Sequence, residues 1–341
     1  MKIVQVGLGF WGRGWMQILA GSDDVQLVAV VDNDESARAW AVGSGAVNAG
    51  MVFASLSECL SRVTDVDSVL ITVPPSAHLD VALEAIENGL ACLVEKPLAP
   101  TLDEAATIVS EADRKNCVVM AAQNYRFKRA AATVAWLVNE RKAVGAVERV
   151  SVRFGAAPSF TGFRLSMDEP LIVDMAIHHF DLMRAVLGVE PTEVYAHSFN
   201  PSWSPFQGNA CANVEFRCAA GATINYQGSW CERGPLTSWD GSWTIEGDRG
   251  CVTWIANRVK FYAHYIDDSV YLDGAIERNG NEMDVPLREL QFEERRGTLH
   301  EFASAVAEKR IPVCSGRDNL NTLAMVFGAV KSHRAGGLVP L

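Results

Sequence analysis

The sequence lacks an apolar run long enough to cross a membrane, and its first residues enter a strand pattern instead of the basic and then apolar pattern of a secretory signal. It is also poor in positive charge, because 30 lysines and arginines stand against 41 acidic residues, for a net charge of -11. An acidic surface repels phosphate backbones and has no basic stripe for a nucleic acid. We therefore expect a cytoplasmic protein with neither a membrane nor a nucleic acid as partner.

Cysteine motifs are absent as well, since none of the eight cysteines stands in a CxxC pair and most have apolar neighbours. This pattern is typical of reduced core thiols and predicts neither a zinc site nor another metal site. The sequence also has no internal repeat, low-complexity segment or long linker. With 341 residues, 49% of them hydrophobic, it exceeds one typical domain, so we expect two tightly packed domains with a cleft between them.

What the sequence does have is a glycine-rich turn between a strand and a helix. Residues 2–6 have a strand pattern and are followed by Gly7-Leu8-Gly9-Phe10-Trp11-Gly12, after which apolar residues recur at helical spacing. In such a turn the first glycine permits a tight bend, the second lets the backbone approach a pyrophosphate, and the third lets helix and strand pack closely. The helix N-terminus adds a positive dipole. Alone, the motif is weak evidence for dinucleotide binding.

Asp32 strengthens that interpretation. A second strand pattern, residues 25–31, ends in this aspartate, 20 residues after Gly12, where its carboxylate would accept hydrogen bonds from the adenosine ribose. The alternative, a structural turn followed by a helix-capping aspartate, explains fewer features of the unit. Because the carboxylate would repel a 2′-phosphate, NAD is favoured over NADP, although Arg38 keeps NADP possible.

Strand and helix patterns then alternate up to residue 123, which predicts a parallel sheet whose strand ends face a ligand crevice. The residues at the glycine-rich turn and at these strand ends are the predicted cofactor-binding set. They are Gly7, Gly9, Phe10, Trp11, Gly12, Asp32, Thr72, Pro74, Pro75, His78, Glu95, Lys96 and Asn124. For His78, near a predicted helix start, a packing or capping role is the preferred alternative.

Lys96 ends one of these strands. The apolar residues Leu93-Val94 lead into Glu95-Lys96-Pro97, and Pro97 lacks the backbone donor that a further ladder position needs. A lysine at the carboxyl end of a parallel strand can present its ammonium to a cofactor or substrate. A solvated lysine that merely closes a strand is the alternative.

After Phe127 the pattern changes. Residues 130–141 have a helical pattern, and residues 194–264 hold several runs of period-two alternation separated by glycine, asparagine and proline. Further long helical patterns cover residues 170–187, 299–309 and 318–334. The predicted fold class is α/β, with an N-terminal Rossmann parallel sheet (residues 1–123) and a C-terminal α+β domain with a large, mainly antiparallel sheet (residues 124–341).

The helical pattern 170–187 contains Asp174 and His178, four residues apart, so we expect them on one face. A carboxylate one turn before a histidine fixes the imidazole, as a general acid or base requires. His179 falls nearer the apolar stripe, which is typical of a core histidine with satisfied hydrogen bonds.

Taken together, these motifs resemble those of the Gfo/Idh/MocA oxidoreductase family, which includes glucose-fructose oxidoreductase and inositol dehydrogenase. The resemblance covers nearly the whole chain and extends to Phe163-Arg164 and Asn124-Tyr125-Arg126-Phe127. It implies that Lys96, Asp174 and His178 form the catalytic set. Family members usually have glycines ahead of the aspartate, where this chain has Asp168-Glu169-Pro170-Leu171, so we expect a different entry to that helix.

The resemblance implies an NAD(P)-dependent dehydrogenase in which a CH–OH carbon passes hydride to the nicotinamide. Lys96 would stabilise the developing oxyanion, and His178, oriented by Asp174, would take the hydroxyl proton. The expected substrate is a sugar, cyclitol or related polyol. The expected substrate-binding residues are Lys96, Tyr125, Arg126, Arg164, Asp174 and His178. Trp230, Trp239 and Trp243 are expected either to stack on sugar faces or to pack in a sheet or subunit interface.

Two other functions stay open. The chain could be a non-catalytic dinucleotide-binding regulator that has kept the fold, or a reductase for a non-carbohydrate substrate. The intact catalytic set favours the dehydrogenase. A homo-oligomer, either a dimer or a tetramer, is expected.

Overall fold

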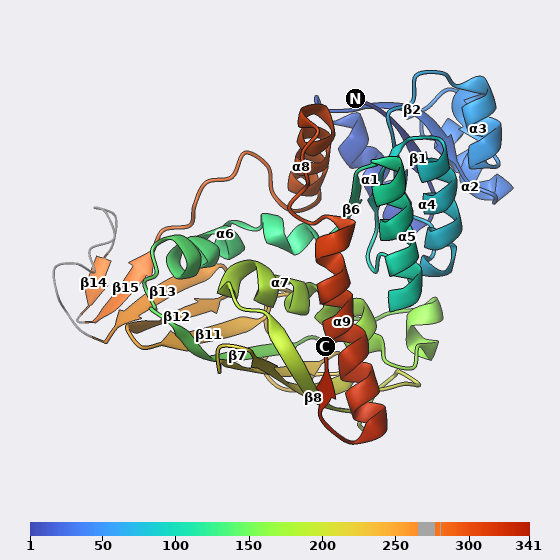
Figure 1. Ribbon diagram of the computed structural model, residues 1–341. Coiled ribbons are helices and arrows are strands. Elements are labelled where there is room, and N and C mark those ends of the chain that lie inside the picture. Colours follow the sequence, from blue (N-terminus) through green and yellow to red (C-terminus); the bar gives the residue numbers. More distant parts are fainter. Residues whose placement is uncertain (265–276, 280) are drawn as a thin grey trace. The chain divides into compact units, whose positions relative to one another are not determined.

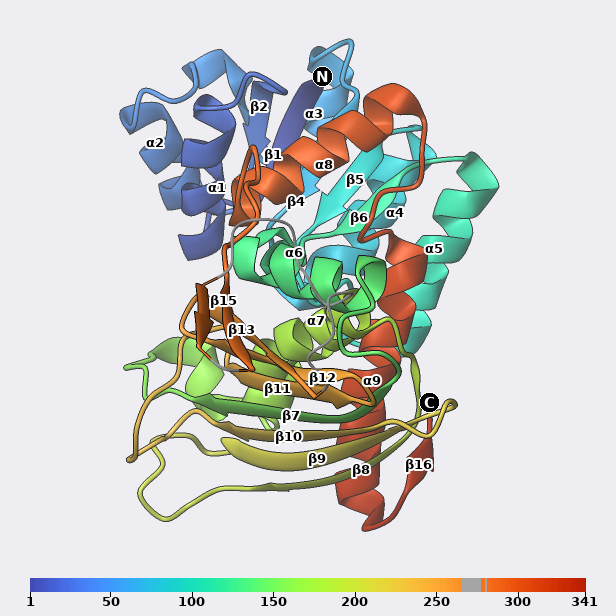
Figure 2. The same cartoon turned by 90° about the vertical axis from the view of Figure 1, so that its left-hand side faces the viewer.

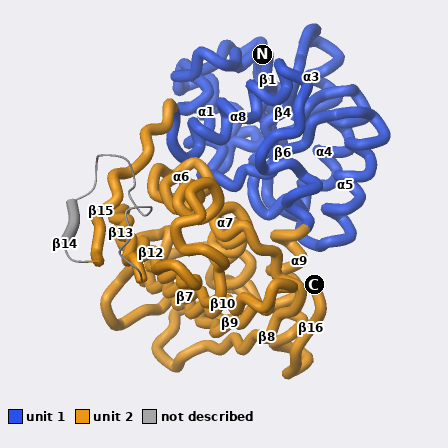
Figure 3. The backbone as a smooth tube through the Cα atoms, turned by 60° about the vertical axis from the view of Figure 1, so that its left-hand side comes forward, with its two compact units in different colours: residues 1–124, 292–320 blue, residues 125–291, 321–341 orange. Residues whose placement is uncertain are grey.

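A computed structural model describes residues 1–264, 277–279 and 281–341. For residues 277–279 it describes the backbone alone. It divides into two compact units (Figure 3), of which unit 1 holds residues 1–124 and 292–320, and unit 2 holds residues 125–291 and 321–341. We had expected residues 124–341 to form one domain. Residues 292–320 instead belong with the N-terminal residues, because helix α8 (Glu294–Glu308) packs against α1 (Phe10–Ala20).

Unit 1 is built on a six-stranded parallel sheet with the order β3-β2-β1-β4-β5-β6, which confirms the predicted fold class. Its strands are β1 (Lys2–Val6), β2 (Gln26–Val31), β3 (Val52–Phe53), β4 (Ser68–Ile71), β5 (Ala91–Val94) and β6 (Val119–Ala121). Every residue of β4 and β5 is buried, as expected for strands covered on both faces. The order β1-β4-β5 brings the turns that follow these three strands to neighbouring positions on the carboxyl edge of the sheet.

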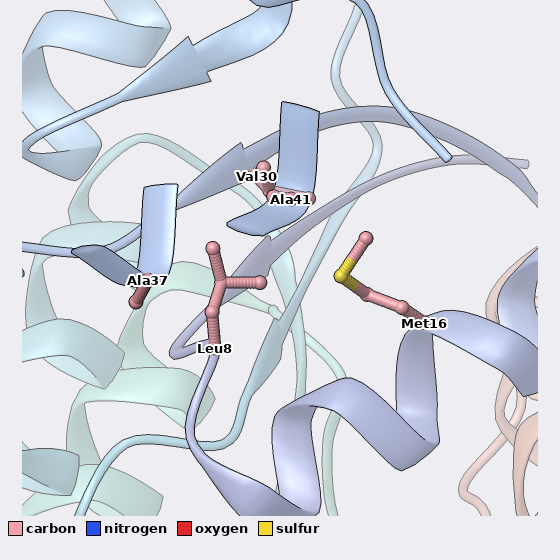
Figure 4. Packing of buried hydrophobic residues seen from close by; sticks show 5 residues of the cluster. All are labelled: Leu8, Met16, Val30, Ala37 and Ala41. Atoms are coloured by element: carbon pink, nitrogen blue, oxygen red, sulfur yellow. The ribbon is translucent and has the colours of Figure 1, made fainter. Parts of the chain in front are cut away.

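The helices that cover this sheet follow the apolar periodicity of the sequence. Besides α1 and α8 they are α2 (Glu35–Gly43), α3 (Leu56–Arg62), α4 (His78–Glu87) and α5 (Leu102–Lys115), with 3-10 turns at η1 (Ala49–Met51) and η2 (Pro75–Ala77). One buried cluster joins α1 and α2 to β2 through Leu8, Met16, Val30, Ala37 and Ala41 (Figure 4).

Unit 2 is built on a ten-stranded sheet with the order β14-β15-β13-β12-β11-β7-β10-β9-β8-β16. Its strands are β7 (Val147–Gly155), β8 (Pro191–Phe199), β9 (Cys211–Cys218), β10 (Thr223–Ser229), β11 (Ser242–Gly247), β12 (Gly250–Ile255), β13 (Arg258–Ala263), β14 (Glu277–Asn279), β15 (Glu282–Val285) and β16 (Val339–Pro340). Among the described pairings, β7 and β10 run parallel and the others antiparallel. The predicted large, mainly antiparallel sheet is therefore confirmed.

One face of this sheet is covered by helices α6 (Arg129–Ala135) and α7 (Ile177–Leu187), as Figures 1 and 2 show. Residues of β8 and β10 are therefore buried at every second position. The remaining helical elements are η3 (Asn124–Phe127), η4 (Trp136–Glu140), η5 (Gly162–Ser166), η6 (Leu171–Ala176) and α9 (Gly316–Ala335). No described helix is both long and apolar enough to span a bilayer.

Two predicted helices differ from expectation in the same way. The segment 130–141 consists of α6 followed by the π-helix η4, and the segment 170–187 consists of the π-helix η6 followed by α7. Asp174 lies in the π-helical part and His178 in the α-helical part. A π-helix has more residues per turn than an α-helix, so the four-residue phase assumed between these two residues does not hold strictly.

Candidate active site

The glycine-rich turn at the carboxyl end of β1 is held by buried polar groups. Gln5, fully buried, donates from Nε2 to the carbonyl oxygens of Gly7 (3.0 Å) and Gly12 (2.7 Å). The Thr72 hydroxyl donates to the same Gly7 oxygen at 2.8 Å, so this predicted cofactor residue supports the turn from its buried side. Sequence reasoning missed Gln5, although a glutamine within the apolar strand Ile3-Val4-Gln5-Val6 was a signal.

The glycines are required for different reasons. Gly7 has φ +102°, and a Cβ there would lie 2.6 Å from the Thr72 carbonyl carbon, while a Cβ on Gly12 would lie 2.2 Å from the Gly7 oxygen. Both positions therefore need glycine for the fold itself. A Cβ on Gly9 would meet no atom within 4 Å, so the open space at Gly9 is available for a pyrophosphate.

The surroundings of this turn fit a dinucleotide. Gly9 caps α1 without a side-chain hydrogen bond, and the first turn of α1 has no acidic residue, which leaves the positive end of the helix for an anion. Asp32 accepts the Leu8 amide at 2.6 Å, so its half-buried carboxylate lies beside the turn, where a ribose hydroxyl would bind. Arg38 donates to the Asp32 carbonyl oxygen at 2.8 Å and adds a positive charge at the same place.

The other predicted cofactor residues of unit 1 differ in exposure. Phe10 and Trp11 are exposed beside Gly9, with 85% and 45% of their surface accessible. Pro74 is exposed after β4, and the residues Pro75, Glu95, Lys96 and Asn124 are half-buried. Thr72, Glu95 and Lys96 follow β4 and β5 at the edge that carries the glycine-rich turn.

His78 is fully buried, and its ring nitrogens lie 2.9 Å from the carbonyl oxygens of Pro97 and Val73. Burial lowers the pKa of His78, so the ring is neutral near pH 7 and donates to one of the two carbonyls at a time. A fully buried ring has no surface for a cofactor. His78 therefore has the packing role that was the preferred alternative, and we correct its predicted cofactor contact.

The predicted catalytic and substrate residues of unit 2 form two pairs. Asp174 accepts a hydrogen bond from Arg164 Nε at 2.6 Å, and the Arg164 guanidinium also lies over the rings of Phe160 and Phe163. The His178 ring stacks on Tyr125, with centroids 4.5 Å apart. His178 is 8% exposed, so stacking and burial both restrict its ring.

Arg126 has a structural position. Its Nε and Nη2 donate to the two carboxylate oxygens of Asp181 at 2.6 and 2.7 Å, and the side chains are 8% and 1% exposed. Thr322 donates to the same carboxylate at 3.0 Å. A buried bidentate pair explains this arginine without a ligand, so we correct its predicted substrate contact to a structural role.

Other predictions concern buried side chains of unit 2. His179 is fully buried between the Tyr226 hydroxyl (3.0 Å) and the Trp239 carbonyl oxygen (2.9 Å), which confirms a core histidine with satisfied hydrogen bonds. Trp230 and Trp243 are 2% and 1% exposed and therefore pack in the core instead of stacking on a sugar. Trp239 remains 47% exposed. Six of the eight cysteines are buried, as predicted for core thiols.

Comparisons with known proteins agree with this architecture. Residues 1–123 match the model of the oxidoreductase family with an NAD-binding Rossmann fold, and residues 135–253 match the GFO/IDH/MocA C-terminal domain. An uncharacterized protein of Sinorhizobium fredii, y4oX, is 26% identical over 98% of this chain and 94% of its own length. D-apiose dehydrogenase of Paraburkholderia graminis is 25% identical over 98% of this chain and 88% of its own.

Among solved structures, an oxidoreductase from Agrobacterium radiobacter in complex with NAD⁺, L-tartaric acid and magnesium superposes with a TM-score of 0.85. The match covers 100% of this chain and 98% of the other at 18% identity, so it establishes the fold. The family models account for the glycine-rich turn in unit 1 and for most of the large sheet in unit 2. The chain belongs to the Gfo/Idh/MocA family of oxidoreductases, whose N-terminal domain is an NAD-binding Rossmann fold.

Proposed function

We propose that the protein is an NAD-dependent dehydrogenase that oxidises a CH–OH group of a sugar, a cyclitol or a related polyol. The observation that carries the proposal is the position of Lys96 at the end of β5, on the carboxyl edge where β1 carries the glycine-rich turn and Asp32 ends β2. A fixed ammonium beside a dinucleotide site can stabilise an alkoxide that develops during alcohol oxidation.

In this proposal NAD, when bound, supplies the hydride acceptor. Lys96 stabilises the negative charge that develops on the substrate oxygen, and His178 takes the hydroxyl proton. Asp174 orients His178. The stacking of His178 on Tyr125 and the Arg164–Asp174 ion pair support these roles, because each restricts a side chain that must hold its direction during proton transfer.

The relatives support the proposed substrate class. One of them is a D-apiose dehydrogenase whose match covers 98% of this chain. Tyr125 and Arg164 remain the proposed substrate-binding residues besides the catalytic set. The side chain of Arg164 is 17% exposed, and its guanidinium lies over the rings of Phe160 and Phe163, an environment suited to a polyol hydroxyl beside an apolar C–H face.

The experiment is a panel of alcohols assayed for NAD reduction at 340 nm, with myo-inositol, D-apiose, other aldoses and non-carbohydrate hydroxy acids as separate groups. We expect turnover with at least one sugar or cyclitol, and turnover lower by about 100-fold or more in Lys96→Ala under the same conditions. Turnover confined to hydroxy acids would replace the substrate class. Tight NADH binding with no turnover in any group would favour a non-catalytic dinucleotide-binding regulator.

A further inference from the structure

The backbone around Lys96 is held from both sides by side chains of unit 1. On one side, Glu95 accepts the Lys96 amide on Oε2 at 3.1 Å and the indole N–H of Trp15 on Oε1 at 2.6 Å. Trp15 is fully buried in α1, the helix that begins at the glycine-rich turn. The carboxylate is therefore fixed by a rigid donor, and it in turn fixes the amide of the lysine.

On the other side, the buried ring of His78 lies between the carbonyl oxygens of Pro97 and Val73. Val73 belongs to the segment after β4, so His78 connects the turns that follow two neighbouring strands. The residues next in sequence, Leu98 and Ala99, are fully buried as well. Lys96 thus stands on a short turn whose preceding and following residues are both anchored.

The contacts of Glu95 exceed what the strand itself requires. Glu95 is half-buried, and its two oxygens are used by one indole and by the backbone of the next residue. An ordinary strand end needs neither contact, because the Glu95 amide already donates to the Ile71 oxygen at 2.9 Å in the sheet. A preorganised ammonium does need them, since a shift of about 1 Å in a catalytic group can cost about 100-fold in rate.

We infer that Glu95 and His78 are positioning residues that fix the backbone on either side of Lys96, and that Trp15 ties this turn to the helix of the dinucleotide-binding turn. The inference rests on the proposed function, because it assigns Lys96 a role in turnover. It replaces a direct cofactor contact as the role of both Glu95 and His78.

The first test needs no substrate. Hydrogen exchange of the Lys96 amide is followed by NMR in protein labelled with ¹⁵N-lysine, for wild type, Glu95→Ala, Trp15→Phe and the control Asp103→Ala, which alters an exposed carboxylate of α5. We expect exchange about 10-fold faster or more in Glu95→Ala and a smaller acceleration in Trp15→Phe, because the amide loses its acceptor or the acceptor loses its anchor. Equal exchange in all four proteins would overturn the inference.

The second test separates positioning from a general loss of structure. Glu95→Gln and His78→Gln are each made in wild type and in Lys96→Ala, and kcat and the NADH dissociation constant are measured with the best alcohol of the panel. We expect each to lower kcat about 10-fold in the wild-type background and hardly at all without Lys96, with NADH affinity little changed. Equal losses in both backgrounds would overturn the inference.

Near-normal turnover of Lys96→Ala alone would instead reject the proposed role of Lys96 in turnover. The hydrogen-exchange result would then still decide whether the backbone at Lys96 is held by Glu95.

Discussion

At the scale of single residues, the choice between NAD and NADP depends on Asp32. Its carboxylate lies beside the glycine-rich turn, held by the Leu8 amide, while Arg38 contacts the carbonyl oxygen of the same residue. The carboxylate would repel a 2′-phosphate, whereas Arg38 is engaged by the Asp32 carbonyl oxygen. We expect wild type to prefer NAD.

Removal of this charge should change the preference. In Asp32→Ala we expect the ratio of kcat/KM for NAD to that for NADP to fall about 100-fold, because a like-charge contact is lost and Arg38 remains. Asp67→Asn, which alters a carboxylate that accepts the Lys2 amide at the amino end of β1, is the control and should leave the ratio unchanged. A tenfold preference of wild type for NADP would show that Arg38 or another basic group outweighs the aspartate.

His179 should make the stability of the protein depend on pH. Burial lowers its pKa from 6.5 to about 4. Between pH 6.5 and about 4 this histidine is protonated in the unfolded chain but neutral in the native protein. The free energy of unfolding therefore has its full value above pH 6.5 and falls as the pH drops toward 4, by up to about 3 kcal/mol.

Urea unfolding between pH 7 and 4 measures this effect. His179→Gln should flatten the pH dependence, because glutamine does not titrate, whereas the exposed-ring control His197→Gln should leave the slope of wild type. Identical slopes in all three proteins would mean that His179 binds protons equally in the native and unfolded states, and would contradict the lowered pKa.

At the scale of elements, the Arg126–Asp181 pair should hold η3 and α7 together, since its partners come from those two elements and Thr322 joins from α9. Arg126→Met leaves a carboxylate buried without its cation and should destabilise the protein by about 3–5 kcal/mol, whereas Arg126→Met with Asp181→Leu should recover much of the loss. Urea unfolding followed by circular dichroism tests this. Arg149→Met removes an exposed ion pair with Glu246 and should destabilise the protein far less than Arg126→Met does. Equal losses in the two variants would contradict the structural role of Arg126.

Elements with a strong period and local caps could be predicted from the sequence. Helix α5 (Leu102–Lys115), one of the helices in the predicted alternation of strands and helices, has such caps, because Thr101 accepts the Glu104 amide at its start and Asn116 ends it with φ 54°. Helix α8 begins at Glu294, five residues before the predicted start at 299, because its first turn is polar. The π-helices η4 and η6 have no such local signal, since packing against neighbouring elements decides the widened turn.

The difference between local signals and distant contacts also explains which site residues could be predicted. Lys96 was predicted because Pro97 marks the strand end beside it in sequence. The role of Arg126 was not, because its partner Asp181 lies 55 residues away. For His78 a packing role was the preferred alternative, but its partner Pro97, 19 residues away, was not foreseen. A sequence pattern reveals the type of a polar residue, but its burial depends on contacts between distant segments.

At the scale of the whole molecule, the proposed catalytic residues are divided between the two units. Lys96 belongs to unit 1, which carries the dinucleotide-binding turn, and Asp174 and His178 belong to unit 2. Each unit alone therefore holds an incomplete catalytic set. In the proposed mechanism Lys96 and His178 act on one substrate hydroxyl, so their effects on turnover should be interdependent.

A double-mutant cycle of Lys96→Ala and His178→Ala, with kcat measured at saturating NAD and the best alcohol of the panel, tests this requirement most directly. We expect each single change to lower kcat about 100-fold or more with NADH affinity little changed, and the double variant to lose much less than the product of the two. Strictly multiplicative losses, or near-normal turnover in His178→Ala, would contradict the account.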